Sequence, residues 1–289
     1  MLGSEFVRTY ASKGYAAWEA AALEIARQDG LTPWPWIDLI LSDGSNHAIL
    51  KVQSDVLSVG PVGDHVRLPL TPKAAQNIFN LNGWLLPTPW LTYQIWKQAP
   101  IKLTPTPMAP NKGANLAQYA AHSSVIDQQI QQASGAPGQL IAGEKKHVVV
   151  SNIAQPGKVL IFGWYRPAPD VFDDGKPMVT PGRQPTQPKS NVHGDFYVDY
   201  SHGIQAIGPV ALVNGESMST VDLYQHPTFS KLVSNEGPVR VPRYPSAVQP
   251  PKGPTHEAMY PAGITVVPTM PSLSQLGLSE MRARPKRSV

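Results

Sequence analysis

Chemically useful side chains are most densely grouped between residues 191 and 207, in the stretch NVHGDFYVDYSHGIQAI. Two His-Gly pairs enclose imidazole, carboxylate, phenol and hydroxyl groups, which can move protons, hold a metal or activate a nucleophile. In an extended chain alternate side chains point to one face of the strand. We therefore expect a half-buried strand whose polar face carries His193, Asp195, Tyr197, Asp199 and Ser201.

Nucleophilic catalysis is the first chemistry that these residues support. A hydroxyl becomes a good nucleophile when a base takes its proton and a carboxylate orients that base. The stretch contains all three groups: Ser201, His193, and Asp195 or Asp199. Neighbours on one strand face lie about 7 Å apart, too far for a hydrogen bond. A residue distant in sequence, such as His147 or His122, would have to complete the arrangement.

A metal site is the second interpretation. Imidazole and carboxylate suit zinc or another divalent transition ion. Two such ligands come from His193 with Asp195 or Asp199, but the sequence has no HExxH helix to complete the set. A divalent metal therefore stays open as a cofactor.

A pair of lysines before the apolar run VVV is expected to support the same site. Lys145 can stabilise a developing oxyanion or bind an anionic group, although two lysines at the start of a strand are often only solvated. The predicted catalytic residues are His193, Asp199, Ser201, His202 and Lys145. The predicted substrate-binding residues are Lys146, Tyr197 and Tyr200.

His193-Gly194 followed by Ser201-His202-Gly203 resembles the signature of L,D-transpeptidases, enzymes that cross-link peptidoglycan. In that family the motif runs His-Gly, a spacer, then Ser-His-Gly-Cys. Here Ile204 stands at the position of the nucleophile and the spacer is shorter. Since the chain has no cysteine, that activity cannot operate as it does in the family.

A broader resemblance covers most of residues 1–245 and points to a bacterial family of hypothetical proteins with no established activity. It implies that the two halves form one unit and that Gly3–Phe6 is native sequence, not the remnant of a cloning site. The segments that carry it are GSEF at 3–6, VRLPLTP at 66–72, AQ at 75–76, LPT at 86–88, AGEKK at 142–146, VHG at 192–194 and DYSHGI at 199–204.

Composition excludes several classes of protein. The 31 prolines among 289 residues argue against a helical bundle, and the absence of cysteine excludes disulfides and thiolate catalysis. The net charge of +4 is gathered in part at the basic C-terminus, which is more typical of a solvated tail than of a nucleic-acid interface. No apolar run is long enough to span a bilayer. We expect a soluble protein whose compartment stays open, with export or association with the envelope as one of the alternatives.

Periodicity and turn residues predict an α+β fold with a small N-terminal sheet and a mostly antiparallel β region. The predicted helices are 6–28, 72–82, 90–99 and 114–132, with short helical turns at 220–224 and 227–232. The predicted strands are 37–41, 48–52, 56–59, 65–70, 140–142, 147–150, 159–164 and 209–213.

Four parts are expected along the chain. They are an α+β part (1–103), a proline-rich linker with a polar helix (104–137), a β-rich part with the site (138–245), and an extended proline-rich arm (246–289). The long loop 167–190 should border a cleft.

Two functions follow from these expectations. The first is a hydrolase that acts on a bacterial envelope polymer or peptide through a His/Asp-centred site. The alternative is a non-enzymatic virion or surface component whose proline-rich arm assembles homo-oligomers.

Overall fold

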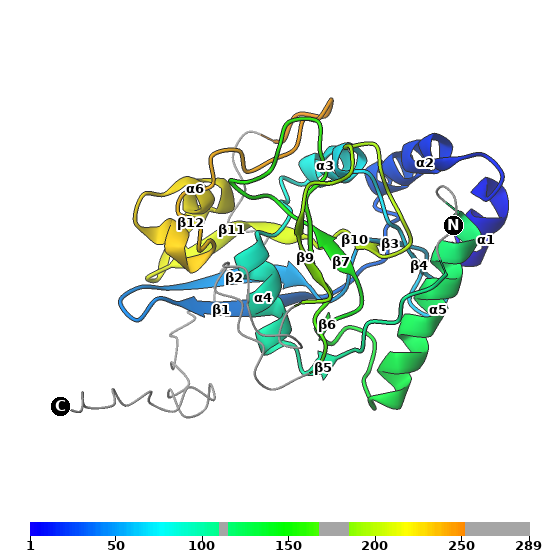
Figure 1. The fold of residues 1–289 in the computed structure, drawn as a ribbon, viewed down its shortest axis with the longest axis horizontal. Coiled ribbons are helices and arrows are strands. Elements are labelled where there is room, and N and C mark those ends of the chain that lie inside the picture. Colours follow the sequence, from blue (N-terminus) through cyan, green and yellow to red (C-terminus); the bar gives the residue numbers. More distant parts are fainter. Residues whose placement is uncertain (110–114, 168–184, 252–289) are drawn as a thin grey trace, which may run out of the picture.

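The structure is a computed structural model that describes residues 1–109, 115–167 and 185–251. It confirms the predicted α+β class, with helices packed around mostly antiparallel sheets (Figure 1). The predicted arm beyond Pro251 and residues 168–184 of the predicted loop lie outside these ranges.

The first sheet combines two strands from the N-terminal part of the chain with two strands that follow residue 206. Its strand order is β1 (Trp36–Ser42), β2 (His47–Gln53), β11 (Ile207–Val213) and β12 (Glu216–Ser219), with all neighbours antiparallel. The β1–β2 hairpin was predicted and is confirmed. Its turn is closed by Asp43, whose Oδ1 accepts hydrogen bonds from the backbone N–H groups of Ser45 and Asn46.

The second sheet carries the candidate site. Its order is β10 (His202–Gly203), β7 (Lys146–Val148), β8 (Ile161–Gly163) and β9 (Gln187–Ser190). Only the β10–β7 pair is parallel. The parallel pair places the lysine segment directly beside His202.

Two short ladders complete the β structure of the described ranges. The strands β3 (Ser58–Val59) and β4 (Val66–Arg67) pair antiparallel, and β5 (Ile101–Lys102) pairs parallel with β6 (Ile141–Ala142).

The predicted single helix 6–28 is wrong, because two helices occupy this region. They are α1 (Gly3–Tyr10) and α2 (Tyr15–Arg27), and Gly14 between them has a φ of +76°, a conformation that glycine adopts without strain. The Gly3 N–H donates to the carbonyl of Asp64, and Phe6 is fully buried. The segment Gly3–Phe6 is thus an integral part of the fold.

Helices α3 (Pro72–Leu81) and α4 (Pro89–Gln98) begin as their sequences predict. Thr71 and Thr88 cap them by accepting hydrogen bonds from the N–H groups of Ala74 and Leu91. The remaining helices are α5 (Leu116–Gln132), α6 (Thr220–Gln225) and the short 3-10 helix η1 (Phe229–Leu232). Figure 1 shows α1, α2 and α5 gathered at one end of the molecule and α6 at the other.

One large hydrophobic core runs through the described chain and includes residues from α1, β2, α4, β7 and β11. A smaller cluster lies where α5 meets β5 and β6. The division of the chain into four parts stays a prediction. A domain boundary at any of the predicted positions within the core would have to divide this shared hydrophobic core. At the start of the predicted arm, Ser246 and Val248 hydrogen-bond to Asn77 of α3 in the same chain.

None of the helices within the described ranges combines the length and the hydrophobicity that crossing a bilayer requires.

Candidate functional site

Residues 191–201 do not form the predicted strand. The N–H of Asp195 donates to the carbonyl of Gly157, and the N–H of Tyr197 donates back to Gly194, which bends the segment into a turn. The segment bends again at Asp199, whose carboxylate accepts a hydrogen bond from the backbone N–H of Ser201. This local turn competes with strand pairing. Only His202 and Gly203 join a sheet, as β10.

Asp199 is the centre of the hydrogen bonds at this turn. Its Oδ1 accepts from the backbone N–H of Ser201 at 2.7 Å and from the Ser201 hydroxyl at 2.5 Å, while its Oδ2 accepts from the Tyr197 phenol at 3.1 Å. Burial would raise the pKa of Asp199, but the nearby His202 and these donors hold it below its usual value. Asp199 is therefore a carboxylate at neutral pH.

His202 is fully buried, and neither of its ring nitrogens has a hydrogen-bond partner among the described residues. Its Nε2 lies 4.0 Å from Oδ2 of Asp199, a gap longer than a direct hydrogen bond. Burial lowers the pKa of His202 to about 4, so the imidazole is neutral at pH 7. Buried polar groups are nearly always satisfied, so such an imidazole calls for a functional explanation or a bridging water.

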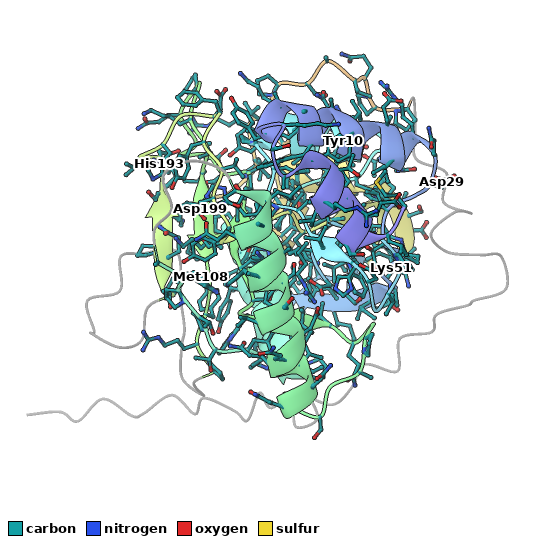
Figure 2. The ribbon with its side chains drawn as sticks, turned by 90° about the vertical axis from the view of Figure 1, so that its right-hand side faces the viewer. Tyr10, Asp29, Lys51, Met108, His193 and Asp199 are labelled. Atoms are coloured by element: carbon teal, nitrogen blue, oxygen red, sulfur yellow. The ribbon has the colours of Figure 1, made fainter. Side chains whose placement is uncertain are left out.

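A ring contact leads from His202 to the molecular surface. The Tyr197 ring stacks on His193 at 3.8 Å between centroids and meets His202 edge-on at 5.7 Å. Both His193 and Tyr197 are half-buried. Figure 2 shows His193 and Asp199 on the same side of the molecule, next to α5.

Lys145 lies behind this surface and is fully buried. Its Nζ is 2.9 Å from Nδ1 of His122 on α5, and it donates to the carbonyl of Tyr200. Burial and the charge of Arg67 lower the pKa of Lys145 to about 7, and burial and Lys145 lower that of His122 to about 3. Neutral His122 therefore accepts a hydrogen bond from the lysine.

The predicted substrate-binding residues lie on both sides of this cluster. The Lys146 ammonium lies 5.4 Å from the centroid of the Trp164 ring. The Tyr200 phenol accepts from the N–H of Met108 at 2.7 Å and donates to its carbonyl at 3.2 Å. Tyr200 thus fastens the segment before α5 to the site.

Pairing of β10 with β7 requires glycine at position 203. The N–H of Lys146 donates to the carbonyl of Ser201 at 2.7 Å and brings the two strands together. A Cβ atom at Gly203 would lie 2.6 Å from Cβ of Lys145 and 3.1 Å from a methyl group of Val56. The second His-Gly pair of the sequence motif therefore has a packing role.

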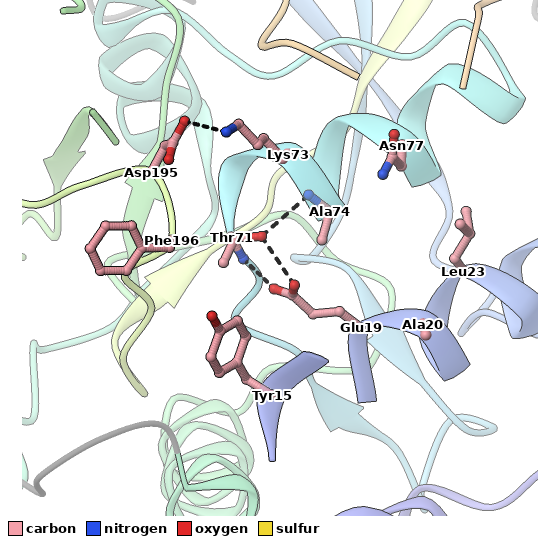
Figure 3. A pocket seen from close by; sticks show the side chains of 10 residues that line it. All are labelled: Tyr15, Glu19, Ala20, Leu23, Thr71, Lys73, Ala74, Asn77, Asp195 and Phe196. Atoms are coloured by element: carbon pink, nitrogen blue, oxygen red, sulfur yellow. Dashed lines mark hydrogen bonds and ion pairs between the residues drawn. The ribbon is translucent and has the colours of Figure 1, made fainter. Parts of the chain in front are cut away.

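Asp195 does not contact the other predicted site residues through its carboxylate, which instead forms an ion pair with Lys73 of α3 at 2.7 Å. Asp195 lines two surface hollows. One, of about 420 Å³, lies beside Glu19, Thr71 and Phe196 (Figure 3). The other, of about 390 Å³, includes Arg240.

The predicted metal ligands His193, Asp195 and Asp199 do not form a closed set. Within residues 1–109, 115–167 and 185–251, no three His, Asp or Glu side chains are grouped so that they could hold a metal ion. A divalent metal stays a prediction.

Sequence reasoning named His122 and His147 only as distant partners and missed Glu144. The Glu144 carboxylate is buried and lies 3.2 Å from Nε2 of His147, in the same strand region as Lys145. The run GEKKH at 143–147 carried the signal, since a cluster of charged residues next to an apolar strand is unusual.

Searches of protein-family models, curated proteins and solved structures found no match to this chain.

Proposed function

We propose that the chain is a hydrolase whose reaction centre is the pair His202 and Asp199, and that it acts on a peptide or other polymer of a bacterial envelope. One observation carries the proposal: a neutral, fully buried imidazole without a hydrogen-bond partner among the described residues faces an anchored carboxylate across 4.0 Å. Perturbed titratable groups that converge in this way are typical of active sites.

In this proposal water is the nucleophile. A water molecule beside the pair bridges both groups, and His202 takes its proton while the water oxygen bonds to the carbonyl carbon of the substrate and the π electrons of the carbonyl move to its oxygen. Asp199 stabilises the imidazolium that forms. The imidazolium then gives its proton to the leaving amine as the amide bond breaks, which restores the neutral imidazole.

Ser201 and Lys145 act as positioning residues in this proposal. The Ser201 hydroxyl is buried and donates to Asp199 instead of to an imidazole, so it fixes the carboxylate. Lys145 is held by His122 and the Tyr200 carbonyl, and it fixes the backbone that leads into Ser201.

The surface around the pair supports a polymeric substrate. The Asp199 side chain is 27% exposed and gives the pair its access to solvent. Val192 and Phe196 are both highly exposed. They belong to the same turn as Asp195, which lines the two hollows. The resemblance of the His-Gly and Ser-His-Gly motifs to those of peptidoglycan enzymes supports an envelope polymer.

The test is a hydrolysis assay with purified peptidoglycan and with its isolated cross-linked peptides. The wild-type chain should release new amino groups, while Asp199→Asn and His202→Gln should lower the rate by about 100-fold or more. Asp38→Asn is the matched control, because Asp38 pairs with Lys51 on β2 away from the site. Full activity in both site variants, or no wild-type turnover on either substrate, contradicts the proposal.

A further inference from the structure

A third hollow, of about 190 Å³, lies near the C-terminal end of α5 and is lined in part by Arg67. Its volume accommodates about six waters at ~30 Å³ each. The described residues that line it come from the segments 34–67 and 127–141 and include none from 191–203. The cavity is therefore separate from the proposed reaction centre.

The charged side of the cavity is organised by Arg67, which is 1% exposed. Its Nε and Nη2 donate to Asp55, and its Nη1 donates to Asp127 at 2.8 Å and to the Ser123 carbonyl at 3.2 Å. Burial alone would lower the pKa of Arg67, but the two carboxylates raise it, so the guanidinium stays charged. Since these donors are engaged within the protein, Arg67 is a clamp for carboxylates and a poor receptor for an anion.

His65 is the unsatisfied group of the cavity. Its side chain is 7% exposed, and neither ring nitrogen hydrogen-bonds to any residue in the described ranges. The ring stands edge-on to Trp34 at 4.8 Å, and its Nε2 lies 3.6 Å from Oδ1 of Asp127. Burial and the charge of Arg67 lower the pKa of His65, so the imidazole is neutral and offers a lone pair.

The net charge of the cavity lining favours a cationic ligand. Two carboxylates, one guanidinium and a neutral imidazole leave the described lining with one net negative charge. Asp127, whose side chain is 37% exposed, is the carboxylate that a ligand can reach. Trp34, Ile130 and Ile141 give the same cavity an apolar part of its lining.

We propose that this cavity binds a primary ammonium group on a short alkyl stem, with the ammonium donating to Asp127 and His65 and the stem lying against Trp34 and Ile130. A charge-assisted hydrogen bond to Asp127 and a hydrogen bond to the orphaned imidazole satisfy the polar wall. The same chemistry is presented by a free alkylamine and by the side chain of a lysine in a peptide. The proposal does not depend on the hydrolase activity.

The first test measures the binding of three probes, each with four carbon atoms, to the wild-type chain by isothermal titration calorimetry at neutral pH. n-Butylamine should bind saturably with a dissociation constant in the millimolar range, whereas 1-butanol and butyrate should not. This comparison of the three affinities needs no variant, so it tests the proposal even if a substituted chain fails to fold. No saturable heat from the amine through the millimolar range, or equal binding of the alcohol, overturns the proposal.

Two variants locate the site. Asp127→Asn should weaken butylamine about tenfold or more, as expected for loss of a charged acceptor, while Asp38→Asn should bind it as the wild type does. An unchanged affinity in Asp127→Asn overturns the proposal.

A third arm distinguishes the sources of the amine. If Nα-acetyl-lysine methylamide binds as butylamine does, the site accepts lysine side chains of peptides. If only butylamine binds, the ligand is a free amine. Both results support an ammonium site.

Discussion

The Nζ of Lys145 lies 2.9 Å from Nδ1 of His122, and both side chains are buried. Burial is the main reason why the pKa values of both groups fall, with the charge of Arg67 adding to the effect on Lys145 and the charge of Lys145 adding to the effect on His122. The pair connects α5 to the start of β7, the strand that lies beside His202.

Lys145 should make stability rise with pH in the alkaline range. The pKa of Lys145 is about 7 in the native state, against an ordinary lysine value of 10.5. Between these values the unfolded chain binds more protons, so the free energy of unfolding increases with pH and the gain is lost as pH falls toward 7. Urea unfolding from pH 7 to 10 should show a slope on the order of 1 kcal/mol per unit. Lys145→Met should flatten that slope, and an unchanged slope would contradict the buried amine.

His202 should set the acid limit of hydrolysis. The proposed base must be neutral, and its pKa is about 4. The rate kcat/KM should therefore hold through mildly acidic pH and fall only as pH approaches 4, instead of near the ordinary histidine value of about 6.5. A pH–rate profile on a labelled envelope peptide measures this limit. An acid limb near 6.5 would exclude His202 as the base.

Ser201→Ala separates a positioning role from a nucleophilic one. If the hydroxyl only anchors Asp199, its loss should lower kcat by about tenfold and stability by about 1–2 kcal/mol. If Ser201 were the nucleophile, the Ser201→Ala variant would retain almost no turnover. Steady-state kinetics together with a serine-directed fluorophosphonate decide the matter, since the proposal expects no labelling of the wild type.

Gly203→Ala should destabilise the chain by about 1–3 kcal/mol, because the new methyl group would overlap Cβ of Lys145. Gly194→Ala is the control within the same motif. The atoms nearest to its methyl group would belong to the ring of Phe196, which is highly exposed and free to rotate away. Thermal unfolding of both variants should show a lower Tm for the first and a small change for the second.

Arg67→Met should be among the most damaging single changes, at about 3–5 kcal/mol, since it leaves Asp55 buried without its partner. The double variant Arg67→Met/Asp55→Asn removes the uncompensated charge. It should recover part of the loss in urea unfolding. A double variant that is no more stable than the single one would argue against the ion pair as the cause.

The elements that the sequence predicted well carry local signals. Thr71-Pro72 and Thr88-Pro89 fix the starts of two helices through capping hydrogen bonds, and Asp43 fixes the first hairpin. The strand assigned to 191–201 failed because alternation alone does not supply a pairing partner. The Asp199 side chain there accepts a hydrogen bond from the backbone N–H of Ser201 instead.

The grouping of side chains at the candidate site could be predicted only in part, and their roles stay a prediction. Asp199, Ser201, Tyr197 and His202 are neighbours in sequence and meet in the structure through short-range contacts. Two other interactions depend on tertiary packing, which no local sequence pattern encodes. They are the contact of Lys145 with His122 and the ion pair of Asp195 with Lys73. The assembly role of residues 246–289 and the envelope location stay predictions.

The pairing of β2 with β11 has a consequence for biosynthesis. A ribosome releases Leu50 long before Ala211, its partner in the ladder. Until β11 emerges, β2 presents an apolar, unpaired edge, the kind of edge that recruits other chains. Nascent chains that stop before residue 207 should therefore aggregate or bind chaperones, and the slowest folding step should follow the arrival of β11.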